Sequence, residues 1–397
     1  MISDLEAVVA GHICLDLHPD LSGAAREPFE KIFRPGHLIA SGPVSFATGG
    51  AVSNTGLALH RLGVRTKLVG KVGDDQFGET VCRIIASHGE NLTDCMIIDP
   101  ASGTSYTVII NYPGVDRIFL HSSGVNDTFQ AHDIPYQLLN QARLFHFGYP
   151  PLMRATFTAN GTALADIFRR ARNTGITTSL DMAFPDPASE AGRADWQSIL
   201  QGVLPYVDIF IPSVEEILFM MQRATYEEMC GAAAGSNILP LITPRLLSDI
   251  AQELIEMGAG IVGLKLGYRG LYVRTDNPTR LISMGRARPS NPEAWATKEL
   301  WAPCFKVAVA GTTGSGDATI AGFLAALLRD LSLEESLRLA VAIGACNVEA
   351  VDALSGIQSW ETTRARMDAG WEQQTLDLDD PHWNFDEGSG LWRGPAA

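Results

Sequence analysis

The sequence has few cysteines, and none of them is spaced to bind a metal. Six cysteines occur in 397 residues, and no two of them form a C-x-x-C pair. They are Cys14, Cys82, Cys95, Cys230, Cys304 and Cys346. Such scattered cysteines favour reduced, mostly buried thiols over a disulfide framework. The nine histidines show neither H-E-x-x-H nor H-x-H spacing, which argues against a zinc site.

Long apolar runs and an excess of positive charge are also missing. No run of eighteen or more apolar residues occurs, so no membrane span is predicted. The formal net charge of −15 argues against nucleic acid or an anionic membrane surface as a partner. Asp4 and Glu6 stand where a secretory signal would have a basic region, so a cytoplasmic protein is expected. The absence of G-x-x-x-x-G-K-[ST] excludes P-loop chemistry.

The second half of the chain alternates between strand and helix patterns. The composition is globular, with 46% hydrophobic residues, and the length allows one large α/β domain with an appendage. Another helix is expected to start at Ser213, where Glu216 completes a capping box. Strands are predicted at 144–147, 176–180, 208–211 and 261–266, and helices near 160–173, 193–203 and 244–257. This alternation predicts a parallel sheet covered on both faces, with ligands beyond the carboxyl ends of its strands.

The first half of the chain is less regular. A single buried strand is predicted from residue 7 to residue 15, ending at Asp16, and a helix is predicted over 53–62. Strand-like segments at 18–48 and 104–120, the second with a turn at 112–116, suggest a small β-sheet apart from the main body.

Three further segments fit neither pattern. Residues 223–240 are rich in Gly, Ala and Asn and are interpreted as an insertion. Residues 275–303 are interpreted as a loop-rich excursion. The acidic segment after Trp360 either packs as a short helix plus an arm or remains partly disordered.

The most distinctive segment is residues 310–317, A-G-T-T-G-S-G-D, which a helix follows at once. A Gly-Ser-Gly turn at a helix start leaves backbone N–H groups unpaired, and with the helix dipole they form an anion site. Asp317 would repel a resting phosphate, but it can accept a proton from a hydroxyl that attacks the phosphate. This combination suggests phosphoryl transfer. Alternatively, Asp317 is an ordinary Asp in the first turn of a helix, where Asp is favoured anyway.

A second glycine motif occupies residues 49–58, G-G-A-V-S-N-T-G-L-A. Paired glycines at a helix start let a ligand approach the backbone closely. The amide of Asn54, on the first turn, can both donate and accept hydrogen bonds. The alternative is a plain helix N-terminus with an ordinary Asn.

The two motifs lie about 260 residues apart and, in this order, resemble the signatures of the PfkB family of carbohydrate kinases. The first is similar to the family's G-G-x-x-x-N signature, and the second is similar to D-T-x-G-A-G-D. Gly124-Val125-Asn126 resembles a G-A-N segment of the family. Leu264-Lys265-Leu266-Gly267 resembles the strand and turn beside the nucleotide. The resemblance covers about residues 7–357.

This resemblance implies a ribokinase-like fold: a three-layer α/β sandwich with a mostly parallel central sheet and a small β-sheet lid. The kinase domain would span residues 1–360, with the lid at about 17–48 and 104–122 and a C-terminal tail at 361–397. ATP, with Mg²⁺, would phosphorylate a sugar hydroxyl. The lid would exclude water and would allow a homodimer.

The resemblance also implies roles for individual residues. Asp317 would be the general base, and Gly314, Ser315 and Gly316 would supply backbone N–H groups to the developing charge. The sugar would be bound by Asp16, Gly49, Gly50 and Asn54. The nucleotide would be bound by Gly267, Thr312, Thr313 and Asn347, and Glu216 would belong to the magnesium shell.

The chain departs from the family pattern at three positions. Gly311 replaces the first Asp of D-T-x-G-A-G-D, which puts activation by a monovalent cation in doubt. Ser213 replaces the Asn of the family's N-x-x-E motif, and Asp181 lacks the Asn that often follows it. Gly311 and Ser213 leave open a catalytically weakened sugar- or nucleotide-binding protein on the same fold. A nucleoside kinase of the same family also stays open, because the lid sequence gives no decisive aromatic clamp; Phe46, Tyr106 and Phe119 are candidates that could equally be lid core.

Overall fold

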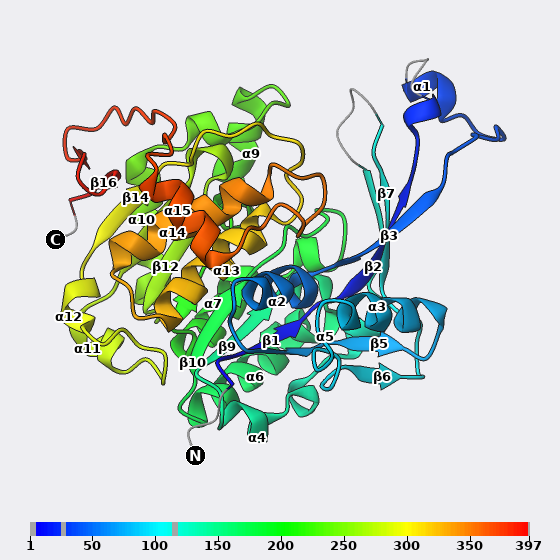
Figure 1. Ribbon diagram of the computed structural model, residues 1–397, viewed down its shortest axis with the longest axis horizontal. Helices are drawn as coiled ribbons and strands as arrows, with labels where there is room; N and C mark the ends of the chain where they lie inside the picture. Colours follow the sequence, from blue (N-terminus) through cyan, green and yellow to red (C-terminus); the bar gives the residue numbers. More distant parts are fainter. Residues whose placement is uncertain (1–4, 25–28, 113–117, 396–397) are drawn as a thin grey trace.

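The computed structural model describes residues 5–24, 29–112 and 118–395 (Figure 1). A ten-stranded sheet forms its centre, in the order β15-β16-β14-β13-β12-β11-β10-β9-β1-β4. Its strands are β1 (Ala7–Gly11), β4 (Thr66–Val69), β9 (Leu144–Gly148), β10 (Thr177–Asp181), β11 (Ile209–Phe210), β12 (Ile261–Lys265), β13 (Leu271–Thr275), β14 (Glu299–Ala302), β15 (Asn384–Asp386) and β16 (Leu391–Arg393). The adjacent strands from β4 to β12 are parallel and the others antiparallel, which confirms the predicted α/β class.

Helices cover both faces of this sheet because its strands are apolar on both sides. Val9 and Leu68 belong to one buried cluster, whereas their neighbours Val8 and Val69 belong to the other. The first cluster includes residues of α2 (Ala51–Arg61), α3 (Gln76–Ala86), α11 (Pro278–Ile282), α12 (Pro292–Trp295), α13 (Ser315–Leu328), α14 (Leu333–Asn347) and α15 (Trp360–Asp368). The second includes residues of α4 (Tyr136–Leu139), α5 (Arg154–Phe157), α6 (Thr162–Asn173), α7 (Trp196–Val203), α8 (Val214–Met221) and α10 (Pro244–Glu256). None of the helices in the described ranges is long and apolar enough to cross a membrane.

The predicted lid is a four-stranded sheet in the order β3-β2-β7-β8, which projects from the body with α1 (Phe29–Ile32) near its tip (Figure 1). Its strands are β2 (Cys14–Pro19), β3 (Val44–Gly49), β7 (Tyr106–Ile110) and β8 (Ile118–Ser122). Most of the predicted turn at 112–116 lies outside the described residues. A separate two-stranded sheet pairs β5 (Lys71–Gly73) with β6 (Ile97–Asp99).

The single strand predicted over 7–15 is wrong. The chain leaves the main sheet after Gly11 and enters the lid at Cys14, so Asp16 lies on lid strand β2 and does not end the first strand. Gly11 has φ 126°, and a Cβ there would lie 2.3 Å from the carbonyl oxygen of Gly148. Because residues 8–10 before this bend and 13–15 after it are buried and apolar, with His12 the single polar residue between them, the sequence pattern reads as one run.

The segments that the sequence left unassigned contain regular structure. Residues 223–240 form α9 (Arg223–Ala232) and a short 3-10 turn. Residues 275–303 are not only loops, because they hold α11, α12 and the sheet strand β14. After α15, the C-terminal segment forms the hairpin β15–β16, which pairs with β14 and extends the main sheet (Figure 1).

Candidate active site

Helix α13 begins at the glycine-rich turn. Its N-cap residue, Gly314, has φ 70°, and a Cβ there would lie 2.6 Å from the Cβ of Ala353. The hydroxyl of Ser315 donates to the carbonyl oxygen of Thr312, which closes the turn at 3.0 Å. The Ser315 amide also donates to the Thr312 carbonyl oxygen, at 3.3 Å, and the other amides of a first helical turn have no partners within the helix and point outward from its positive end. The turn is therefore built to receive an anion.

Asp317 lies on this first turn and is buried, with 4% of its surface exposed. Its Oδ1 accepts a hydrogen bond from the Thr55 hydroxyl at 2.9 Å. Its Oδ2 accepts bonds from the Asn54 amide at 3.2 Å and from the Tyr149 hydroxyl at 2.7 Å. Asn54 and Thr55 belong to the start of α2, so this carboxylate joins the two glycine motifs that are remote in sequence.

The second glycine motif packs tightly against the junction of main sheet and lid. Gly50 caps α2 with φ 90°, and a Cβ there would lie 2.4 Å from the carbonyl oxygen of His12. A Cβ on Gly49 would lie 2.4 Å from Oδ2 of Asp16. The motif thus brings bare backbone next to the Asp16 carboxylate. Burial raises the pKa of Asp16, although its contact with Cys14 lowers it.

The residue after β9 is Tyr149, which has φ 65°, an uncommon conformation for a bulky residue. Its ring stacks toward His12 at 6.3 Å between centroids, and His12 lies 5.2 Å from His121 of lid strand β8. Burial lowers the pKa of His12, and the neighbouring His121 lowers it further. Burial also lowers the pKa of His121. Both imidazoles are therefore neutral near pH 7.

A buried ion pair lies at the ends of β10 and β12. Lys265 Nζ contacts Asp181 Oδ1 at 2.6 Å, and a Cβ on Gly316 would lie 3.6 Å from the same Nζ. Burial raises the pKa of Asp181 to about 8, against the opposing charge of Lys265, and the carboxylates of Glu216 and Asp317 raise it further. Burial opposes the charge on Lys265, yet Asp181 and Glu216 raise its pKa. The ammonium group therefore stands beside the anion-binding turn.

Glu216 completes the predicted capping box of α8. Its Oε2 accepts from the Ser213 amide at 2.7 Å, and the Ser213 hydroxyl accepts from the Glu216 amide at 3.3 Å. Among the described residues, no group of three or more His, Cys, Asp or Glu side chains is arranged to hold a metal ion directly. An ion at this end would have to be held mainly through phosphate oxygens and water, as suits Mg²⁺.

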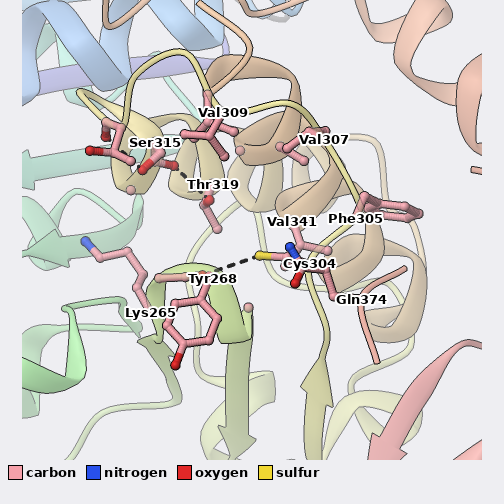
Figure 2. A pocket seen from close by; sticks show the side chains of 17 residues that line it. Lys265, Tyr268, Cys304, Phe305, Val307, Val309, Ser315, Thr319, Val341 and Gln374 are labelled. Atoms are coloured by element: carbon pink, nitrogen blue, oxygen red, sulfur yellow. Dashed lines mark hydrogen bonds between the residues drawn. The ribbon is translucent and has the colours of Figure 1, made fainter. Parts of the chain in front are cut away.

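A cavity of about 210 Å³, here called the α13–α14 pocket, opens beside the anion-binding turn. It is lined by Lys265, Gly267, Tyr268, Gly270, Cys304, Phe305, Val307, Val309, Thr312, Ser315, Gly316, Thr319, Val341, Gly344, Ala345, Val348 and Gln374 (Figure 2). Gly267 and Thr312, predicted to bind the nucleotide, line it. Thr313 and Asn347 do not: the buried amide of Asn347 instead donates to the Thr313 carbonyl oxygen at 2.9 Å and supports the turn from behind.

Gly311 packs against the segment that follows α14. A Cβ there would lie 2.8 Å from the carbonyl oxygen of Val351 and 3.0 Å from that of Ala350. Its amide donates to the carbonyl oxygen of Val348. A carboxylate at this position would require the backbone to shift, so the departure from the family motif is built into the local packing.

Residues 7–360 match the pfkB family of carbohydrate kinases. The chain belongs to this family. A fructokinase-2 of Oryza sativa subsp. japonica is 25% identical over 338 residues, which cover 83% of each protein. A sugar kinase of Archaeoglobus fulgidus that has not been characterised is 26% identical over 303 residues, or 76% of this chain and 98% of that one.

Solved structures share the fold. Arabidopsis thaliana ribokinase, complexed with ribose and ATP, has a TM-score of 0.66 at 17% identity, with 92% of this kinase and 98% of that chain covered. An Escherichia coli protein assigned to the ribokinases, in complex with ATP and Mg²⁺, has a TM-score of 0.63 at 18% identity. The match covers 92% of this kinase and 99% of that chain. This kinase therefore has the ribokinase-like architecture predicted from its motifs.

Several groups of the site were not foreseen from the sequence. Thr55 directly follows Asn54 and Tyr149 directly follows a buried strand, so position offered a signal for both. The Lys265–Asp181 pair joins the ends of two strands, and only the sheet order reveals it. His121 reaches the site from the lid, and no local pattern marks it.

Proposed function

We propose that this carbohydrate kinase transfers the γ-phosphate of ATP to a hydroxyl of a neutral monosaccharide, with Asp317 as the general base. The observation that supports this most is the position of Asp317. Its carboxylate lies at the start of α13, beside the anion-binding turn, and it also bonds Asn54 of the predicted sugar end. A hydroxyl placed there would lose its proton to Asp317 as it attacks the phosphate.

The phosphate end is proposed to consist of the Gly314–Gly316 turn and Lys265. Backbone amides of the turn would stabilise charge on the transferring phosphoryl group, and the Lys265 ammonium would neutralise part of it. Asp181 Oδ2 is buried and has no hydrogen-bond partner among the described residues. It could therefore accept a hydrogen bond from a water molecule bound to Mg²⁺, and Glu216 could do the same. Bound Mg²⁺ would neutralise phosphate charge and orient the transferring group.

A neutral sugar fits the other end better than an anionic one. Asp16, Thr107 and His121 are register partners across three lid strands, so they share one face of the lid sheet. None of the ion pairs in the described ranges involves Asp16. With neutral imidazoles beside it, this carboxylate would accept bonds from sugar hydroxyls and would repel a sugar acid or a sugar phosphate.

The α13–α14 pocket is the proposed site for the nucleoside part of ATP. Its wall on the side away from Ser315 is apolar, with Phe305, Val307 and Val341, as a base requires (Figure 2). Lys265, Thr312 and Ser315 lie at the end next to the anion-binding turn. The pocket therefore runs from an apolar wall to the proposed phosphate site.

ADP release measured over a substrate panel tests the proposal. The panel should hold fructose, ribose, 2-dehydro-3-deoxygluconate, ribose 1-phosphate and nucleosides. We expect a neutral monosaccharide to stimulate ADP release, and Asp317→Asn to lower that rate by about 100-fold or more, because a positioned general base contributes 10²–10⁴. Asp249→Asn, an exposed carboxylate on α10, serves as the matched control and should leave the rate unchanged.

Two outcomes of the same panel would support other functions. Turnover with nucleosides alone would make the chain a nucleoside kinase. If sugars or ATP bind but no substrate raises ADP release above the Asp317→Asn level, the chain is a binding protein on a kinase fold, as the departures at Gly311 and Ser213 allow. Rates unchanged by Asp317→Asn would remove Asp317 from the reaction.

A further inference from the structure

A short C-terminal segment, residues 371–374, lies against the loop that leads from β14 to α13. We call it the strap. The backbone amide of Gln374 donates to the carbonyl oxygen of Cys304 at 2.7 Å, and the backbone amide of Lys306 donates to the carbonyl oxygen of Glu372 at 2.9 Å. Phe305 and Gln373 form an antiparallel bridge between them. The strap lies outside residues 7–360, so it is an addition to the part of the chain that matches the family.

Aromatic and charged contacts fix the strap in place. The Trp371 ring stacks on Phe305 at 4.6 Å between centroids and 29° between planes, and its Nε1 donates to the Lys306 carbonyl oxygen at 2.9 Å. On the other side, the Arg366 guanidinium lies 3.6 Å from the Trp371 ring centroid. The same guanidinium makes two bonds to the Glu349 carboxylate, at 2.6 and 2.9 Å. Trp371 is thus clamped between Phe305 of the loop and Arg366 of α15.

The strap places one side chain in the α13–α14 pocket. Phe305, Val307 and Val309 of the loop line the pocket, and Gln374 lines it from the strap. Figure 2 shows Gln374 beside Cys304, on the side of the pocket away from Ser315 and Lys265. The side-chain amide of Gln374 belongs to a half-buried residue and, unlike the backbone amide, makes no hydrogen bond to any described residue. It is a polar group at the otherwise apolar end of the pocket.

We propose that Gln374 binds the base of the nucleotide and sets the preference for adenine. This inference rests on the proposed ATP site and adds the residue that selects the base. A glutamine amide offers one acceptor and one donor group. Adenine presents a 6-amino donor beside ring-nitrogen acceptors, and a glutamine amide matches such a pair in two parallel hydrogen bonds. The Trp371 stack holds the backbone that carries this amide, so the strap acts as a fixed wall of the base site.

Two substitutions of Gln374 test the inference. Gln374→Leu removes both hydrogen bonds at similar size, and we expect its KM for ATP to rise by about 10-fold, with a much smaller change in kcat. Gln374→Glu keeps the acceptor and replaces the donor with a second acceptor. A carboxylate accepts from the N1–H and 2-amino groups of guanine, so this variant should shift the ATP-to-GTP preference toward GTP by about 10-fold or more. Gln201→Leu, an exposed change on α7, is the matched control.

Binding measured by calorimetry with ATP and GTP, without sugar, separates this inference from the proposed kinase function. If the two Gln374 variants bind both nucleotides as the unchanged protein does, Gln374 does not read the base, even where sugar phosphorylation proceeds. If ATP affinity falls in Gln374→Leu and GTP is preferred in Gln374→Glu, the inference holds, even where no sugar on the panel is phosphorylated. Thermal unfolding of each variant checks that the strap remains folded.

Discussion

Lys265 is a buried ammonium group surrounded by carboxylates. Asp181 pairs with it directly, and Glu216 and Asp317 also raise its pKa. Glu216 and Asp317 add negative charge around the Lys265–Asp181 pair, and a bound phosphate adds more, so a bound cation is needed to offset it at this end of the site. A pair buried only for stability gains little over apolar residues of the same size. Because the Lys265 ammonium group lies beside Gly316, we infer that Lys265 is kept for binding the phosphate.

Lys265→Met should lower kcat by about 100-fold, because it removes a fixed charge from the transferring phosphoryl group. The same change leaves Asp181 buried without a partner, which should also destabilise the fold by about 3–5 kcal/mol. A steady-state assay with saturating ATP and sugar measures the first effect, and thermal unfolding measures the second.

The double variant Lys265→Met with Asp181→Asn separates the two roles. Removal of both charges relieves the buried carboxylate, so we expect stability to recover while kcat stays well below that of Asp181→Asn alone, the comparison needed because Asp181 is itself proposed to act in the magnesium shell. If kcat recovers together with stability, Lys265 is only a structural partner of Asp181. The comparison works because the two residues lie on different strands and touch through one contact.

At the scale of elements, the lid has two chemically different faces. Alternate residues of its strands point to opposite faces. Asp16, Thr107 and His121 are aligned in one row and line the proposed sugar site. In the next row, Phe46, Leu17, Val108 and Leu120 are register partners across all four strands. Phe46 is 49% exposed and Leu120 is 55% exposed, so the second face is apolar and open to solvent.

An open apolar face of this kind marks an interaction surface, and a second copy of the lid would cover it. We therefore predict a homodimer through this face, as the family resemblance suggested. Phe46→Ser combined with Leu120→Ser should convert the dimer into a monomer in light scattering. Leu38→Ser is the control, because Leu38 is 99% exposed but lies outside the lid strands. A monomeric unchanged protein would contradict the prediction.

The elements that local sequence specifies were the ones that could be predicted. Both glycine motifs start helices, and the amphipathic segments from 144 to 266 alternate as expected for a parallel sheet. β14 and the hairpin β15–β16 could not be foreseen, because they are short, antiparallel and paired across remote segments. Asp16 was expected to contact the sugar, but its place on β2 depends on a bend at Gly11 that leaves no mark in the apolar pattern.

At the scale of the whole molecule, one edge of the sheet gathers the site. β1, β9, β10 and β12 run parallel, so their carboxyl ends bring His12, Tyr149, Asp181 and Lys265 to the same side. The first turns of α2 and α13 meet at this edge through Asp317, and the lid adds His121 beside His12. A tertiary arrangement of this kind joins residues up to 263 positions apart, as in the Asn54–Asp317 contact. This is why the contacts between residues of the site could not be predicted from local sequence patterns.

The C-terminal hairpin stabilises the end of the main sheet that lies farthest from the lid. Trp383, 5% exposed, packs 6.0 Å from Tyr272 and 6.1 Å from Trp301 between ring centroids. We predict that Trp383→Ala destabilises the protein by about 3–5 kcal/mol, because it leaves a cavity among these rings. Phe385→Ala removes an aromatic that is 46% exposed on the same hairpin, and its effect should be smaller. Thermal unfolding compares the two variants. Equal unfolding midpoints would show that the hairpin is an appendage and not part of the folded sheet. A lower midpoint for Trp383→Ala alone, with kcat unchanged at temperatures well below that midpoint, would make the C-terminal segment a structural part of the kinase domain.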